Sequence, residues 1–117
     1  MTQRSQIEAL VRELHAARLA GDLDRLCKVF APDARLRIAG SSDGKPIAID
    51  ASRIARIRPW LSILVKTFRL SRYELLSLTI EGDSAAAHWR VDIESKITGV
   101  CIPTELVDLI EVRGGQI

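Results

Sequence analysis

The residue with the clearest chemical potential in this sequence is Asp108, an acid in a strand-like segment over residues 100–113. Period-two alternation gives it apolar or weakly polar neighbours on one strand face, which are Thr104, Leu106, Ile110 and Val112. A carboxylate buried there without a partner is costly, so the group should be neutral or hydrogen-bonded. Two interpretations stay open. Asp108 is either a neutral acid that donates a hydrogen bond to a ligand's carbonyl or enolate oxygen, or a structural aspartate bonded to backbone or to a helix residue.

The second candidate is His15, in a predicted amphipathic helix whose apolar stripe consists of Ile7, Leu10, Val11 and Leu14. His15 stands one residue beyond that stripe, where it can reach the rim of a pocket as a second polar group and act as a base beside the acid Asp108. The alternative is a histidine at the surface or boundary of the helix. For His88, on the polar face of a later strand, we expect an interface or solvent.

The elements that must position these residues begin with helices. We expect Ser5 to cap the first helix, Gly21 to end it, and Asp22 to cap a short second one. Residues 35–38 alternate as a strand, and 40–46 (GSSDGKP) predict a mobile loop. A helical stretch then starts at Asp50 or Ser52, and its internal proline, at position 59, predicts a kink or two consecutive helices.

The remainder is strand-like over 73–81, 85–97 and 100–113, with turns at Gly82-Asp83 and Thr98-Gly99. Helices followed by an antiparallel meander predict an α+β fold in which the helices cover one face of a curved sheet. The length of 117 residues fits one domain over 1–117.

Composition excludes several classes of protein. Hydrophobic residues make up 47% and charged residues 27% of the chain, which is ordinary for a globular protein and excludes disorder. The net charge of +2 is too small to indicate nucleic-acid binding. No uninterrupted apolar run suggests a signal peptide or a membrane span, so we expect a cytoplasmic protein.

Cofactor and metal motifs are also missing from the sequence. Cys27 and Cys101 lack zinc-ligand spacing, do not form a disulfide framework, and are expected to be small buried residues. There is no glycine-rich phosphate loop and no Ser-His-Asp arrangement. We therefore expect no cofactor and no metal.

Two stretches carry a family resemblance. Residues 20–34 (AGDLD, then FAPDA) resemble the opening of the nuclear transport factor two-like superfamily, and residues 89–117 look like its central hairpin. The superfamily includes SnoaL-like cyclases, ketosteroid isomerase and limonene epoxide hydrolase. The resemblance implies a cone-shaped, cystatin-like half-barrel whose N-terminal helices cover the concave sheet face, and a homodimer. Members commonly continue past the turn at Gly115–Ile117 into a last strand, so we expect an open pocket or one completed by a partner.

The resemblance also implies an apolar pocket that holds a small hydrophobic molecule. Its expected lining is Leu14, Leu36, Ile38, Trp60, Leu64, Phe68, Trp89, Val91 and Ile110. For Trp60, simple core packing is the alternative. We expect the dimer to form through the outer sheet face, where charges of both signs allow complementary pairing across a two-fold axis. This face carries His88, Arg90, Asp92, Glu94, Glu105, Val107, Leu109 and Glu111.

Catalytic residues transfer only in part. By similarity to ketosteroid isomerase, the tyrosine position falls on Leu14 and the base position on Ile38. Neither of these side chains can donate or accept a proton. The acid position falls on Asp108. Steroid isomerisation is therefore not expected.

Arg90-Val91-Asp92 copies the Arg-x-Asp of limonene epoxide hydrolase, but the family register falls one residue earlier, on Trp89 and Val91. A one-residue slip reverses the sheet face, which favours an outward pair over a catalytic one.

Three functions stay open. The first is a binding module with an apolar pocket. The second is an isomerase, cyclase or hydrolase on a carbonyl compound, with Asp108 as hydrogen-bond donor and His15 or the substrate moving the proton. The third is a subunit that assembles only with a partner.

Overall fold

The computed structural model describes residues 3–42 and 45–117. Helix α1 (Arg4–Ala20) is followed by α2 (Leu23–Cys27). Gly21 ends α1 in the left-handed conformation, with φ at 66°, and the Asp22 side chain accepts the Arg25 backbone N–H, so both predicted signals are confirmed. Ser5 is not the first cap, because a reciprocal pair of Gln3 and Gln6 starts the helix two residues earlier.

The next element is a hairpin. Strands β1 (Arg35–Ser42) and β2 (Lys45–Ser52) pair antiparallel, from Arg35↔Ser52 to Ser42↔Lys45. The expected loop over 40–46 is wrong for residues 40–42 and 45–46, which belong to these strands; residues 43 and 44 lie outside the described part. Turn-forming residue types favoured a loop locally, whereas backbone pairing across the hairpin continues through them.

Helix α3 (Ile54–Thr67) starts later than expected, because β2 occupies the residues up to Ser52. The chain changes direction at Arg53, whose φ of 72° is unusual for a residue other than glycine. Pro59 lies inside this single helix, so the two-helix expectation is wrong. Position 59 falls in the second turn, close to the end where backbone N–H groups have no helical acceptor.

Three long strands complete the fold: β3 (Phe68–Glu81), β4 (Ser84–Ser95) and β5 (Cys101–Glu111). They pair antiparallel in the order β3-β4-β5, next to the separate two-stranded sheet β1-β2. The expected strands and turns are confirmed within a few residues, except that β3 begins five residues earlier than expected.

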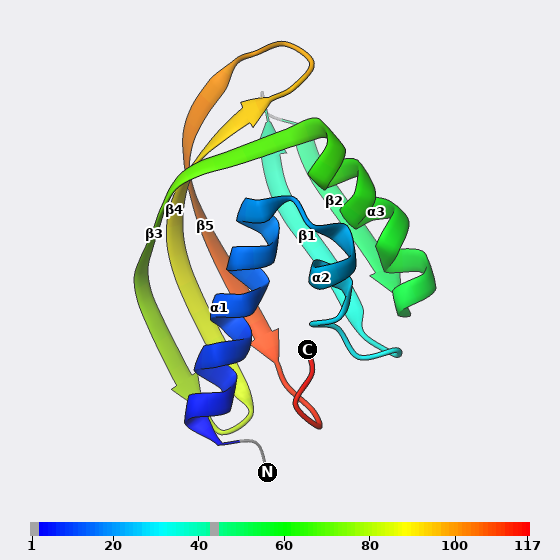
Figure 1. Ribbon diagram of the computed structural model, residues 1–117, viewed down its shortest axis with the longest axis vertical. Coiled ribbons are helices and arrows are strands. Elements are labelled where there is room, and N and C mark those ends of the chain that lie inside the picture. Colours follow the sequence, from blue (N-terminus) through cyan, green and yellow to red (C-terminus); the bar gives the residue numbers. More distant parts are fainter. Residues whose placement is uncertain (1–2, 43–44) are drawn as a thin grey trace.

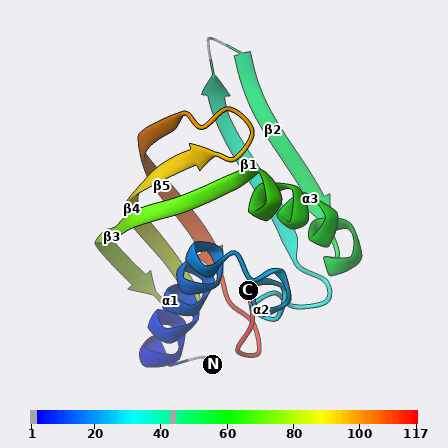
Figure 2. The ribbon, with the colours of Figure 1, turned by 45° about the horizontal axis from the view of Figure 1, so that its top comes forward.

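The layers follow from these elements. Figures 1 and 2 show α1 against the three-stranded sheet and α3 along the β1-β2 hairpin. Apolar side chains of α1, α2 and α3 meet the inner faces of the strands in one core, whose most buried members include Ile7, Val11, Leu26, Ile57 and Ala87. The prediction of an α+β fold with a helix-covered antiparallel sheet is confirmed.

The last residues return to the helical end of the molecule. Ile117 donates its N–H to the Val29 carbonyl at 2.9 Å and accepts the Ala31 N–H at 2.8 Å. Ile117 thereby closes one end of the space between α1, β1 and β5.

Candidate functional site

Four side chains from distant parts of the chain meet between α1 and the three-stranded sheet. His15 Nε2 lies 2.8 Å from Asp108 Oδ2, and His15 Nδ1 lies 2.6 Å from the Tyr73 hydroxyl. Trp89 Nε1–H donates to the same Asp108 Oδ2 at 3.0 Å. The His15 ring also lies against the Trp89 ring, with centroids 4.4 Å apart. We call these four residues the polar cluster.

The register of β4 and β5 places Trp89 beside Asp108. Ala87 stands directly opposite Asp108, and Trp89 stands opposite Leu106, one position along the same sheet face. Alanine at position 87 leaves room above the carboxylate, and the indole of Trp89 reaches across the diagonal to it. This pairing puts Asp108 on the same sheet face as Trp89 and Val91.

Tyr73 reaches the same face because β3 is irregular. The register with β4 shifts between Ser71 and Glu74, and Arg72 there has a φ of 53°. Such a bulge changes which residues point inward. Tyr73 consequently turns toward α1, where its ring packs edge-on against His15 with centroids 5.3 Å apart.

The donors and acceptors of the polar cluster are consistent with one another. If Asp108 is ionised, His15 must carry a hydrogen on Nε2, and Nδ1 of a neutral imidazole then accepts the Tyr73 hydroxyl. Trp89 Nε1–H donates to Asp108 Oδ2 whichever nitrogen of His15 carries the hydrogen. Asp108 Oδ1 takes part in none of these hydrogen bonds.

Burial also shifts the pKa of two neighbouring groups. Burial raises the pKa of Tyr73, with the Arg12 charge opposing this and the Asp108 charge adding to it. Burial lowers the pKa of Arg18, while the Asp108 charge raises it. Arg18 also lies over the Trp89 ring, with Cζ 5.2 Å from the centroid.

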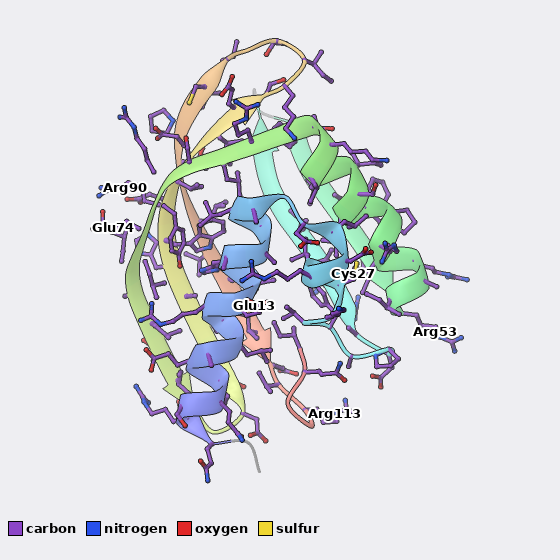
Figure 3. The ribbon with its side chains drawn as sticks, in the orientation of Figure 1. Glu13, Cys27, Arg53, Glu74, Arg90 and Arg113 are labelled. Atoms are coloured by element: carbon purple, nitrogen blue, oxygen red, sulfur yellow. The ribbon has the colours of Figure 1, made fainter. Side chains whose placement is uncertain are left out.

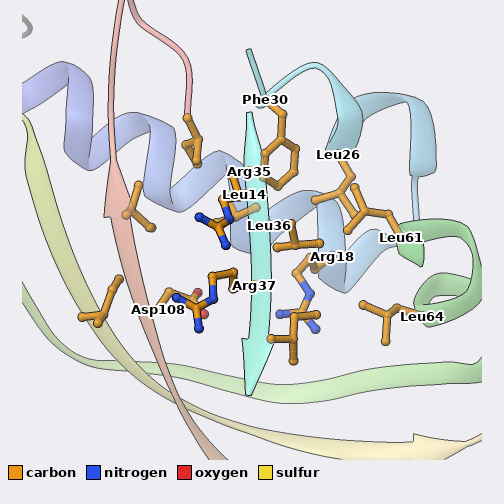
Figure 4. A pocket seen from close by; sticks show the side chains of 14 residues that line it. Leu14, Arg18, Leu26, Phe30, Arg35, Leu36, Arg37, Leu61, Leu64 and Asp108 are labelled. Carbon is orange, nitrogen blue, oxygen red and sulfur yellow. The ribbon is translucent and has the colours of Figure 1, made fainter. Parts of the chain in front are cut away.

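A cavity of about 160 Å³ opens beside the polar cluster, between α1, α2, α3, β1 and β5 (Figure 4). Its polar lining consists of Arg18, Arg35, Arg37 and Asp108. Its apolar lining consists of Leu14, Leu26, Phe30, Leu36, Ile38, Leu61, Leu64, Leu109, Ile110 and Ile117. Asp108 therefore belongs both to the cavity wall and to the polar cluster.

The profile of the SnoaL-like domain family matches residues 11–117, which includes every side chain of this site. The chain belongs to the SnoaL-like domain family. Its expected membership of the nuclear transport factor two-like superfamily is thereby confirmed. No curated protein matches the chain.

Solved structures with the same fold include enzymes. A suspected isomerase from Bacillus subtilis has a TM-score of 0.84 and 19% identity, covering 99% of this chain and 84% of the other. An LEH-like epoxide hydrolase from M. tuberculosis has a TM-score of 0.76 and 12% identity, covering 96% and 77%. An NTF2-like protein from Burkholderia xenovorans has a TM-score of 0.75 and 20% identity, covering 99% and 86%. At these identities the likeness shows the fold of this SnoaL-like chain and leaves its activity open.

The residues expected to line a pocket divide into two groups. Leu14, Leu36, Ile38, Leu64 and Ile110 line the cavity of the SnoaL-like domain together with Asp108. The remaining four do not, namely Trp60, Phe68, Trp89 and Val91.

The reasons differ among these four. Trp89 and Val91 are completely buried, and neither borders this cavity. Trp60 is 41% exposed and Phe68 is 37% exposed, because each lies on the outer side of its element. The alternative of core packing for Trp60 is equally wrong.

The sequence reasoning missed Tyr73 and Arg18. Arg18 follows Leu14 by one helical turn and His15 by three residues, so helical spacing alone could have placed it on the same face. Tyr73 gave no comparable signal, because its inward position depends on the bulge at Arg72.

Arg90 and Asp92 do not form a pair. Arg90 forms an exposed ion pair with Glu74 across β3 and β4, and Figure 3 places the two side by side on the outside of the sheet. Asp92 lies 3.6 Å from Arg72. His88 lies 3.5 Å from Glu105 on the same outer face.

Both cysteines are free, and Cys27 is buried while Cys101 is exposed, so the expectation of burial is wrong for Cys101. Burial raises the pKa of the Cys27 thiol. Within residues 3–42 and 45–117, no group of acidic, histidine and cysteine side chains could hold a metal ion. No helix in this part of the chain is long and apolar enough to cross a membrane.

Proposed function

We propose that this SnoaL-like domain binds a small, mainly apolar molecule in the cavity bounded by α1, β1 and β5. The supporting observation is a cavity of about 160 Å³ whose lining is apolar except for three arginines and Asp108. Ligand sites typically combine an apolar wall with a few polar groups that fix orientation. An apolar cavity of roughly this volume, about 150 Å³, accommodates benzene.

The test uses benzene and a pair of matched variants. Leu64 lines the cavity, whereas its neighbour Ile63 is exposed on the other side of α3. In NMR titrations benzene should shift the methyl signals of Leu14, Leu36 and Leu64. Leu64→Phe should abolish binding by filling the space, and Ile63→Phe should leave it unchanged. Benzene binding that survives Leu64→Phe, or no binding at all, would reject this site.

A second candidate function is proton transfer on a carbonyl compound. It is favoured by the chain of contacts from Tyr73 through His15 to Asp108, which ends at the cavity wall. Because Trp89 donates to Asp108 Oδ2 and His15 Nε2 lies 2.8 Å from the same oxygen, we assign Asp108 the part of proton acceptor instead of the donor expected from sequence. Oδ1 would take a proton from carbon next to a carbonyl, and His15 would hold the carboxylate in place.

This activity is measured as deuterium uptake by small ketones in heavy water. Asp108→Asn preserves size but removes the proton acceptor, so uptake should fall by about a hundredfold or more. Glu105→Gln removes an acid from the opposite face of β5 and serves as the control. Equal uptake by Asp108→Asn and the parent protein would exclude Asp108 as the base.

We also propose that two copies pair through the outer face of β4 and β5. Val107 and Leu109 there are 63% and 82% exposed, and they lie between charged residues of both signs. Large exposed apolar side chains on one face often mark an interface. Light scattering at micromolar concentration should give twice the chain mass of 13.0 kDa. Val107→Lys, on the same outer face but outside the cavity lining, should give the single mass, and a monomeric parent protein would reject the dimer.

A further inference from the structure

Arg18 is the charged side chain of the cavity wall whose position is hardest to explain by packing alone. It projects from α1 into the cavity (Figure 4), and its guanidinium lies over Trp89. The Arg18 guanidinium forms no hydrogen bond with another described residue. Among the described residues, every side-chain nitrogen or oxygen that is shut off from solvent has a hydrogen-bond partner, so the Arg18 nitrogens are not shut off. The Arg18 N–H groups are therefore accessible to solvent, and the side chain lines the cavity.

The other charges in the wall leave a positive excess. Arg35 is occupied by Asp50, to which it donates two hydrogen bonds of 3.1 and 2.7 Å. Arg37 forms no such bond among the described residues. Among the described residues Asp108 is the single acid of the lining; its Oδ2 already accepts from Trp89 and lies 2.8 Å from His15 Nε2. Two guanidinium groups thus face the cavity against one partly engaged carboxylate.

We propose that the molecule held in this cavity is a small apolar carboxylic acid, bound as its carboxylate by Arg18, with Arg37 adding positive charge. This inference rests on the proposed binding function and names its ligand class. A planar guanidinium presents parallel N–H groups that match a carboxylate. Stacking on Trp89 restricts the plane of that guanidinium, which lowers the entropic cost of binding.

The size of the cavity favours a carboxylate attached to one ring or to a short branched chain. A volume of about 160 Å³ leaves room for little more than a body the size of benzene. The negative charge of Asp108 disfavours ligands with several charges, since such a ligand would bring a second anion close to it. A singly charged acid with its apolar body against Leu36, Leu64 and Ile110 meets both conditions.

The probes are benzoate and benzamide, which share the ring and nearly the same size but differ in charge. Their affinities are measured by NMR titration in parallel with benzene. Benzoate should bind about tenfold or more tightly than benzamide, since hydrogen bonds between charged partners are the stronger ones. Added salt should reduce this preference.

Three variants locate the source of the preference. Arg18→Met keeps the length of the side chain and removes its charge, so most of the preference for benzoate over benzamide should be lost. Arg37→Met should reduce the preference only in part, because Arg37 is solvent-exposed. Arg56→Met is the control: Arg56 is exposed on α3, outside the cavity, and its loss should change neither affinity.

The outcomes separate the two proposals. Benzene binding with equal benzoate and benzamide affinities would overturn the carboxylate inference and leave the binding site standing. A benzoate preference that is undiminished in Arg18→Met would also overturn it. Failure of all three probes to bind would reject the site itself. If Arg18→Met does not fold, as judged by circular dichroism, the parent protein and Arg37→Met still decide the question.

Discussion

Two histidine–carboxylate pairs lie on opposite faces of the same sheet and differ in almost every physical respect. His15 and Asp108 are 2.8 Å apart, and their side chains are 1% and 25% exposed. His88 and Glu105 are 3.5 Å apart, and theirs are 38% and 60% exposed. Tyr73 and Trp89 hold the inner pair from two further directions, whereas water competes for both members of the outer pair.

The contrast in burial between the two pairs shows that residue type alone does not indicate a functional site. A buried polar pair requires further hydrogen bonds to offset the loss of hydration. The inner pair has them, and one of its members also borders a cavity. The outer pair needs no such support, because an exposed ion pair of this kind contributes little to stability.

The largest difference between the two pairs is expected when each histidine is removed in turn. His15→Ala leaves the Tyr73 hydroxyl and Asp108 without their partner and also opens a cavity, so unfolding free energy should fall by about 3 kcal/mol. His88→Ala should change it by less than about 0.5 kcal/mol. Urea unfolding followed by circular dichroism measures both. Similar losses for the two variants would show that burial does not distinguish the pairs.

A smaller effect is expected from the second donor to Asp108. Trp89→Phe keeps an aromatic ring under α1 but removes the N–H that lies 3.0 Å from Oδ2. We expect a loss of about 1–2 kcal/mol in unfolding free energy.

The matched control is Trp60→Phe, since Trp60 is half-exposed and its side chain forms no hydrogen bond within the described residues. It should leave stability nearly unchanged. An equally stable Trp89→Phe protein would mean that the indole N–H does not support the carboxylate.

For the inner pair, the sequence predicted on which strand face or helix face each residue lies, and nothing beyond that. Strand alternation placed Asp108 beside apolar neighbours, and helical spacing placed His15 next to Leu14. The burial of His15 at 1% exposure did not follow. Position 15 lies four residues after Val11, on the same helix face, so the buried stripe is wider than its apolar members suggested.

Long-range irregularities explain most of what the sequence did not predict. The inward turn of Tyr73 depends on a register shift near Arg72, which period-two alternation cannot represent. The β1-β2 hairpin was hidden because Gly40, Ser41 and Ser42 are turn-forming types, yet they pair with strand β2. The cavity requires β1 and β5 to face each other across elements far apart in the chain.

The ionisation of the Tyr73 hydroxyl gives a further test of the inner pair. Tyr73 is the single tyrosine of the chain, so ultraviolet titration of the phenolate reports on it alone. Burial and the Asp108 charge raise its pKa above the usual value of about 10. The native state then holds its proton longer than the unfolded state does, so stability is complete below about pH 10 and decreases above it.

Asp108→Asn removes the charge that adds to the raised pKa of Tyr73, so the titration should move to lower pH. Glu105→Gln, on the outer face, should not move it. Tyr73→Phe should flatten the decrease of stability at high pH. A titration curve that is identical in Asp108→Asn and the parent protein would show that the Asp108 charge does not affect the pKa of Tyr73.

The smallest effect concerns the outer face itself, where Arg90 and Glu74 form an exposed ion pair between β3 and β4. A double-mutant cycle with Arg90→Gln and Glu74→Gln should give a coupling energy below about 1 kcal/mol, and added salt should reduce it further. The same cycle with His15→Asn and Asp108→Asn should give a larger coupling with weaker dependence on salt, because that pair is screened less. Equal salt dependence would mean that solvent reaches both faces alike, and the functional assignment of the inner face would lose its physical basis.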